Sequence, residues 1–187
     1  MKKTLLAIAL FAIGISTASA EWKIAGDKIR TEWAEKVDPS NVLPEYPRPQ
    51  LVRSEWQNLN GLWNYAITEI NAATPSTFDG EILVPFAVES ALSGIGKWIT
   101  EKQLLWYERE FTVPSEWMSQ RVMLHFGAVD WSADIYVNDI LVGSHTGGFT
   151  PFACDITAAL NKEGAQKLVV RVWDPTEKGE QPVGKQL

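Results

Sequence analysis

The feature that most constrains this chain is a series of short segments, beginning at Leu59, in which apolar and polar residues alternate. Alternation with a period of two is typical of strands that bury one face and expose the other. Gly, Pro, Asn and Asp residues separate the segments and supply the turns. The pattern therefore predicts an all-β fold of short antiparallel strands, a β-sandwich or jelly roll. The expected strands cover residues 59–69, 81–84, 104–113, 122–126, 134–137, 140–144, 149–156 and 168–173.

The segment 104–113 assigns its side chains to two faces of a strand. One face carries Tyr107, Arg109, Phe111 and Val113, and the other carries Trp106, Glu108, Glu110 and Thr112. We expect the second face to be solvated. Arg109 lies among apolar neighbours, so we expect its charge to be paired with a carboxylate from an adjacent strand.

Between two of the expected strands lies Asn138-Asp139, which predicts a two-residue hairpin turn. Asn tolerates the positive φ that such a turn requires, although Asp is a poorer second residue than Gly.

The part before residue 55 has a different character. Residues 1–20 read as a signal peptide, with a basic start, an apolar stretch and a small-residue cleavage site ending at Ala20. Residues 21–54 form a lead-in arm, in which 27–37 predicts one short helix and Pro44, Pro47 and Pro49 an extended Pro-rich stretch. Residues 55–187 form the remaining domain. Cleavage predicts export to the periplasm or the extracellular space.

Length and charge exclude several classes of protein. The chain has 187 residues, and removal of the first 20, with their two lysines, leaves 167 residues and a net charge of −8. The acidic balance argues against nucleic acid as a partner. No remaining stretch is long and apolar enough to span a membrane. The chain is also shorter than a complete (β/α)₈ barrel enzyme of about 250 residues.

The few Cys and His residues indicate no cofactor. Cys154 is the only cysteine, so no internal disulfide forms, and its apolar surroundings favour a buried structural thiol. Two His residues and one Cys make a structural zinc site improbable. We interpret His125 and His145 as strand or loop surface residues, because neither has an evident partner in a nucleophile motif.

Five motifs follow one another along the chain: Asn58 to Trp63, Leu105 to Pro114, Arg121 to Val129, Tyr136 to Asp139, and His145 to Thr157. In this order they resemble glycoside hydrolase family 2, which contains β-galactosidases, β-glucuronidases and β-mannosidases. Together they cover the chain from about Pro47 to its end. The third is similar to the central strand of the family's sugar-binding domain, and the fourth departs from the usual Val-Asn-Gly by one residue.

The resemblance implies a galactose-binding-domain-like jelly roll, the N-terminal domain of enzymes that continue into an immunoglobulin-like domain and a (β/α)₈ barrel. In that family two barrel carboxylates carry out retaining hydrolysis. The family's Asn-Glu acid/base motif does not occur here, so we assign no catalytic residue. The family also continues into a closing strand after Trp173, which we expect to be missing.

Three residues are candidates for sugar contact. Trp98 lies in an expected loop, where its ring suits either a sugar or another domain. Asp130 and Asp174 flank aromatic strand ends and suit either a sugar hydroxyl or the capping of a loop. Glu108 and Glu110 share a strand face at a spacing that paired carboxylates could use, but a solvated face explains them equally well.

The sequence thus predicts the sugar-binding domain of a secreted family 2 β-glycosidase, present without its barrel and inactive alone. Its expected partners are a β-linked glycan or glycoside and the later domains of a full-length parent. Two alternatives stay open: a free-standing secreted carbohydrate-binding module, and a purely structural or interaction domain.

Overall fold

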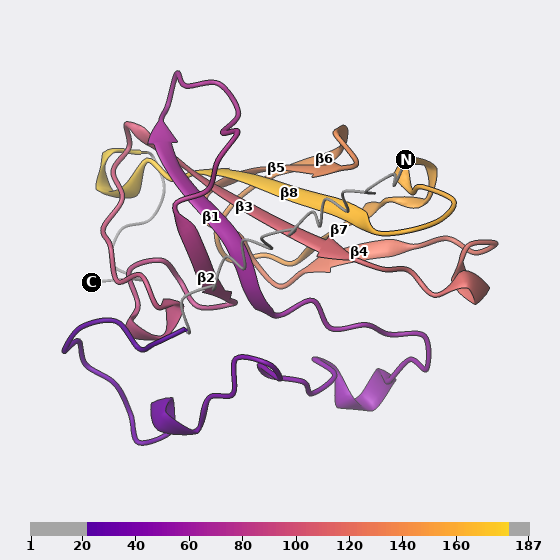
Figure 1. Cartoon of the computed structure of the whole chain (residues 1–187), viewed down its shortest axis with the longest axis horizontal. Helices are drawn as coiled ribbons and strands as arrows, with labels where there is room; N and C mark the ends of the chain where they lie inside the picture. Colours follow the sequence, from indigo (N-terminus) through magenta and orange to yellow (C-terminus); the bar gives the residue numbers. More distant parts are fainter. Residues whose placement is uncertain (1–21, 180–187) are drawn as a thin grey trace, which may run out of the picture.

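The computed structural model describes residues 22–179, and eight strands form two antiparallel sheets within them (Figure 1). The large sheet has six strands in the order β2-β1-β3-β8-β5-β6, and β4 pairs with β7 in the small one. The sequence prediction of an all-β jelly-roll sandwich is confirmed. The strands are β1 Gly61–Glu69, β2 Gly80–Val84, β3 Gln103–Phe111, β4 Met123–Phe126, β5 Ser132–Val137, β6 Ile140–Thr146, β7 Phe152–Asp155 and β8 Gln166–Trp173.

Strict alternation places the core on one face of the large sheet. In β8, Leu168, Val170 and Val172 are buried, whereas the residues between them are only half-buried. The small sheet covers part of this face with Leu124 and Cys154. The loop between β2 and β3 helps to cover the same core through Val88, Ile95 and Ile99. The small β4–β7 sheet and the loop between β2 and β3 therefore together cover the inner face of the large sheet.

The hairpin at Asn138-Asp139 is confirmed, with φ of 50° and 66° at the two residues. The Asn138 side chain also joins the turn to β8. Its amide nitrogen donates to the oxygen of Gln166 at 2.7 Å, and its amide oxygen accepts from the backbone of Lys167 at 2.9 Å. Asn is thus selected here both by backbone conformation and by its two hydrogen-bonding ends.

The prediction of a helix over 27–37 is wrong. Only one turn of 3₁₀ helix, η1 Ala34–Lys36, occurs there. Ile29 and Trp33, which a helix over 27–37 would place on one apolar face, are exposed, so this face has nothing to pack against. A helix this short is not stable without such packing. The other short 3₁₀ turns are η2 Pro49–Leu51, η3 Ala91–Ser93, η4 Ser115–Trp117, η5 Thr157–Ala159 and η6 Thr176–Lys178.

The Pro-rich arm lies against the beginning of β1. Val42 is buried, and the side-chain amide of Asn58 donates to the carbonyls of Val42 at 3.2 Å and Leu43 at 2.9 Å. The amide of Asn60 reaches the Val42 carbonyl at 3.3 Å. The two asparagines of the first motif therefore hold the arm to the sandwich.

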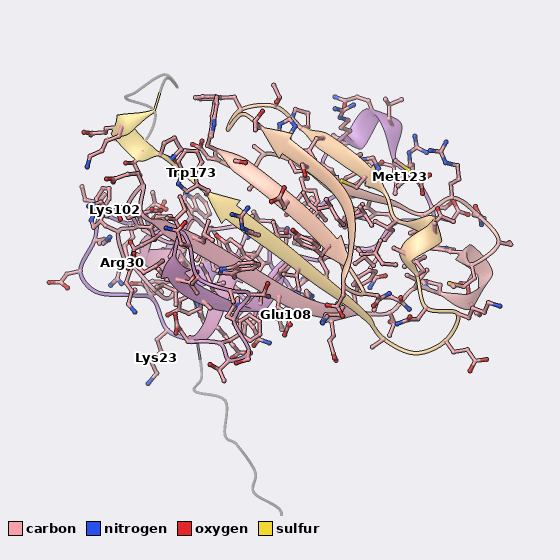
Figure 2. All side chains as sticks on the ribbon, turned by 90° about the horizontal axis from the view of Figure 1, so that it is seen from above. Lys23, Arg30, Lys102, Glu108, Met123 and Trp173 are labelled. Carbon is pink, nitrogen blue, oxygen red and sulfur yellow. The ribbon has the colours of Figure 1, made fainter. Side chains whose placement is uncertain are left out.

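The outer face of the large sheet is less solvated than the sequence indicates. Trp106 is buried there, in a small second cluster with Ala66 and Leu104, and Phe78 from the β1–β2 loop packs against them. Figure 2 looks onto this face, with Trp173 at one end of β8 and Glu108 on the neighbouring β3. The expectation of a wholly solvated face is wrong because a loop that comes earlier in the chain folds over part of it.

Candidate functional site

The three residues predicted for sugar contact all lie near one end of the large sheet, which we call the Trp98 end. Trp98 precedes β3, Asp130 precedes β5 and Asp174 directly follows β8. The strand register brings the second and third together, because Ser132 pairs with Trp173. The indole of Trp173 donates to the Glu101 carbonyl at 2.8 Å, which ties the beginning of β3 to the same end.

Glu89, which the sequence did not indicate, belongs to the same group of charges. Burial raises the pKa of its carboxyl above the ordinary value, and the negative charges of Asp174 and Asp130 raise this pKa further. The positive charge of Lys28 lowers it, and the ammonium of Lys28 also donates to the Glu89 carbonyl at 2.5 Å. Three carboxyl groups and one lysine from four separate segments thus influence one another at the Trp98 end.

Asp130 is positioned by the Gly-Gly turn that follows β6. Gly148 is buried, and a Cβ atom built on it would overlap the carboxylate of Asp130. A side chain at this position therefore cannot be accommodated unless Asp130 moves. Packing therefore requires glycine at position 148, because the absence of a side chain leaves the space in which the Asp130 carboxylate lies.

Asp174 has the capping role that the sequence left open as an alternative. Its Oδ1 accepts a hydrogen bond from the backbone of Thr176 at 2.7 Å and so holds the turn after β8. A carboxylate has more than one acceptor position, so this bond is compatible with further contacts.

Trp98 presents an open aromatic surface at this end. Its side chain is 73% exposed, and the Lys28 ammonium lies 5.5 Å from the ring centroid. An exposed indole beside hydrogen-bonding groups suits the stacking of an amphipathic ligand such as a pyranose. The ring and the carboxylates together provide an apolar surface and acceptors for hydroxyl groups.

Residues 22–28 pack against the loop between β2 and β3 and so support the Trp98 end. The backbone of Ala25 donates to the Ala91 carbonyl at 2.9 Å. Trp22 lies against Gly94, where an added Cβ would come within 2.8 Å of the indole. Lys28 belongs to this segment, and sequence analysis missed it because no local pattern connects residue 28 to residue 89.

The other sequence candidates lie elsewhere. Glu108 and Glu110 point from the outer face of β3, and Glu108 accepts from the Asn64 amide at 3.3 Å. Cys154 is buried, as predicted, and burial raises the pKa of its thiol. Its sulfur lies so close to β6 that an added Cβ on Gly143 would be 2.5 Å from it.

The two histidines differ in exposure. His125 is exposed on β4, as expected. His145 is half-buried and stacks on Phe152 with ring centroids 4.2 Å apart, while its Nε2 lies 3.2 Å from the Thr150 hydroxyl. Within residues 22–179, no group of three or more His, Cys, Asp or Glu side chains has an arrangement that could hold a metal ion.

Within residues 22–179, no carboxylate pairs with Arg109, contrary to the expectation from the sequence. Its Nη1 donates instead to the main-chain carbonyls of Asn60 at 3.1 Å and Leu62 at 3.5 Å. Gly61 lies between these two residues with φ of 129°, and an added Cβ there would be 3.0 Å from Nη1. The guanidinium thus lies against the bare backbone at the beginning of β1.

Comparison with known proteins agrees with this architecture. Residues 80–186 match the family model of the glycosyl hydrolase 2 galactose-binding domain-like family. A β-glucuronidase of Paenibacillus borealis is 31% identical over 133 residues, which cover 67% of this chain and 22% of that protein. A β-galactosidase of Thermoanaerobacter pseudethanolicus is 30% identical over 124 residues, or 64% of this chain and 17% of that protein.

Among solved structures, the β-glucuronidase of Lactobacillus rhamnosus superposes with a TM-score of 0.57 at 29% identity. The superposition covers 68% of this chain and 22% of that one. The chain therefore spans about a fifth of the length of these relatives.

Proposed function

The chain belongs to the galactose-binding domain-like family of glycosyl hydrolase 2, and from this premise we propose that it is the sugar-binding domain of a secreted β-glycosidase of the β-glucuronidase or β-galactosidase type. In this proposal the Trp98 end forms one wall of the substrate pocket. The catalytic carboxylates belong to a barrel domain, so the chain alone binds sugar without hydrolysing it.

The observation that carries the proposal is the composition of the Trp98 end. An exposed indole, the carboxylate of Asp130 on its glycine turn, and the half-buried carboxyl of Glu89 lie at this end and come from separate loops. Stacking on the C–H face of a sugar together with acceptors for its hydroxyls is the usual combination for recognition of a pyranose.

We propose Trp98, Asp130 and Asp174 as the sugar-contacting residues, with Glu89 and Lys28 as their supports. The test is titration of the purified chain with methyl β-D-galactoside and methyl β-D-glucuronide, followed by NMR at the Trp98 indole. Absence of any perturbation there at saturating sugar would refute the assignment.

Inactivity of the isolated chain is tested separately with chromogenic β-glucuronides and β-galactosides. We expect no turnover above a buffer blank. Turnover that the Asp130→Asn variant abolishes would refute this part of the proposal.

Export is part of the proposal and rests on residues 1–20, which lie outside the described residues. Expression of the full chain in a bacterial host, followed by fractionation, tests it. We expect a periplasmic or secreted product that begins at Glu21. A cytoplasmic product that retains its first 20 residues would refute it. No helix within residues 22–179 meets the length and hydropathy that crossing a bilayer requires.

A second candidate function is that of an interaction domain, because the arm exposes several large apolar side chains. These are Ile29, Trp33, Leu43, Leu51 and Val52. Large exposed apolar side chains are found on surfaces that contact another domain. Sugar titrations without binding, combined with self-association that the Trp33→Ala and Leu51→Ala changes abolish, would favour this function over the first.

A further inference from the structure

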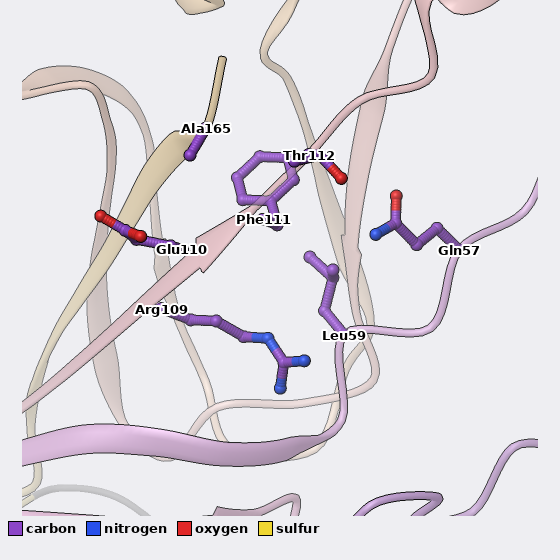
Figure 3. A pocket seen from close by; sticks show the side chains of 7 residues that line it. All are labelled: Gln57, Leu59, Arg109, Glu110, Phe111, Thr112 and Ala165. Carbon is purple, nitrogen blue, oxygen red and sulfur yellow. The ribbon is translucent and has the colours of Figure 1, made fainter.

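A shallow, open hollow of about 320 Å³ lies at the end of β3 opposite to Trp98 (Figure 3). β3 has nine residues, so the hollow is about 25 Å from the Trp98 end, at roughly 3.3 Å per residue. The lining residues are Gln57, Leu59, Arg109, Glu110, Phe111, Thr112 and Ala165.

Arg109 is the only cation in this lining, and its charge is not neutralised by the described part of the chain. None of the ion pairs within residues 22–179 includes Arg109. Its hydrogen-bond acceptors within residues 22–179 are two neutral main-chain carbonyls, both reached from Nη1. Partial burial lowers the pKa of the guanidinium, although an arginine in a protein stays charged. A half-buried cation without a counter-ion favours an anionic ligand.

The rest of the lining resembles a site for a small hydroxylated molecule. Leu59 and the edge of Phe111 offer apolar surface, whereas the amide of Gln57 and the hydroxyl of Thr112 offer hydrogen bonds. Glu110 and Arg109 are adjacent in a strand and point to opposite faces, and Figure 3 shows the two side chains directed apart. The carboxylate of Glu110 therefore lines the hollow without neutralising Arg109.

We propose that this hollow binds a sugar acid, with the ligand carboxylate on the free guanidinium nitrogens of Arg109 and its hydroxyls on Gln57 and Thr112. A planar guanidinium matches a carboxylate through two parallel hydrogen bonds. The opposite-end position makes the hollow a second sugar site, separate from the wall formed by Trp98 and Asp130.

The test is titration of the purified full chain with glucuronate and, as a matched neutral sugar, glucose, followed by calorimetry and by NMR at the Leu59 methyl groups. We expect saturable binding of glucuronate with shifts at Leu59, and none with glucose. The Arg109→Gln change should weaken glucuronate binding about tenfold or more, the loss expected for a hydrogen bond between charged groups. Lys102→Gln, which removes one positive charge at the other end of β3, should leave it unchanged.

The Glu110→Gln variant provides a second test of the site that leaves Arg109 in place. Such a test is needed because the hydrogen bonds of Arg109 also hold the beginning of β1. Removing this exposed negative charge should tighten glucuronate binding and leave the fold intact. Equal binding of glucose and glucuronate, no binding of glucuronate, or an affinity that neither variant changes would overturn the proposal. Because the NMR signals of Leu59 and Trp98 report on different ends, failure here is distinguishable from failure of the sugar-wall function.

Discussion

The carboxylate of Asp130 lies over Gly148, in the volume that any side chain at position 148 would occupy. Asp130 ends the segment before β5, and Gly148 belongs to the turn after β6, which pairs with β5. One contact therefore connects the residue that directly follows the motif Arg121 to Val129 with the motif His145 to Thr157. It also fixes the carboxylate that the proposed function places against the sugar.

The Gly148→Ala change should destabilise the protein and displace Asp130. Overpacking of a buried position costs about 1–3 kcal/mol in the free energy of unfolding. Urea denaturation measures this loss. Gly127→Ala is the matched control, since an added Cβ there meets nothing within 4 Å, and it should be nearly neutral. Equal effects of the two changes would show that the contact with Asp130 does not restrict position 148.

Gly143 and Cys154 should be energetically coupled across the sandwich. An alanine at 143 would place its Cβ 2.5 Å from the Cys154 sulfur, so Gly143→Ala alone should cost about 1–3 kcal/mol. Cys154→Ala removes the sulfur and makes room for that methyl group. The double variant should therefore be more stable than the sum of the single effects predicts, by about 0.5 kcal/mol or more. A double-mutant cycle in urea checks this, and strict additivity would contradict the packing described.

Glu89 should make stability decrease as the pH rises from acid toward neutral. Its pKa is raised in the folded protein, chiefly by burial and then by the charges of Asp174 and Asp130. The folded state thus holds the proton more tightly than the unfolded state. This contribution is fully present below the unfolded value, near 4.5, and is lost as the pH passes the raised folded value.

Glu89→Gln removes this titration. The variant should gain stability relative to the parent at pH 7, and the gain should shrink toward pH 4. Thermal unfolding of both proteins across this range measures the difference. A gain that does not vary with pH, or a loss confined to neutral pH, would contradict the burial of this carboxyl.

Trp98→Ala should abolish binding of methyl β-D-galactoside or methyl β-D-glucuronide at the Trp98 end and leave stability within about 0.5 kcal/mol, because the side chain is largely exposed. Trp33→Ala is a matched control, since Trp33 is also exposed but lies on the arm. Calorimetric titration of both variants compares them. Loss of binding in both, or in neither, would show that the indole of Trp98 is not the stacking surface.

The sequence predicted the strands well because one local rule, alternation, decides them. β5 and β8 follow that rule residue by residue, and the turn at Asn138-Asp139 follows from backbone preferences alone. Trp106 was misjudged because its burial depends on Phe78, which a distant loop brings onto the outer face. The alternation within β3 cannot show that a residue from another segment will cover its outer face.

The same limit applies to the site. The sequence indicates Trp98 from its place in an expected loop, and Asp130 and Asp174 from their positions at aromatic strand ends. The strand register does bring Asp130 and Asp174 together. Glu89 and Lys28 were missed because their interaction joins residues that are far apart in the chain. The acceptors of Arg109 were missed for another reason: they are main-chain carbonyls, which every residue possesses.

The most direct test of the proposed function is NMR mapping of methyl β-D-galactoside and methyl β-D-glucuronide on the purified chain, with hydrolysis followed in the same samples. The account predicts shifts at the Trp98 indole and at the amides of Asp130 and Asp174, with intact glycoside at the end. Release of methanol from either glycoside, or shifts confined to residues away from the Trp98 end, would contradict it.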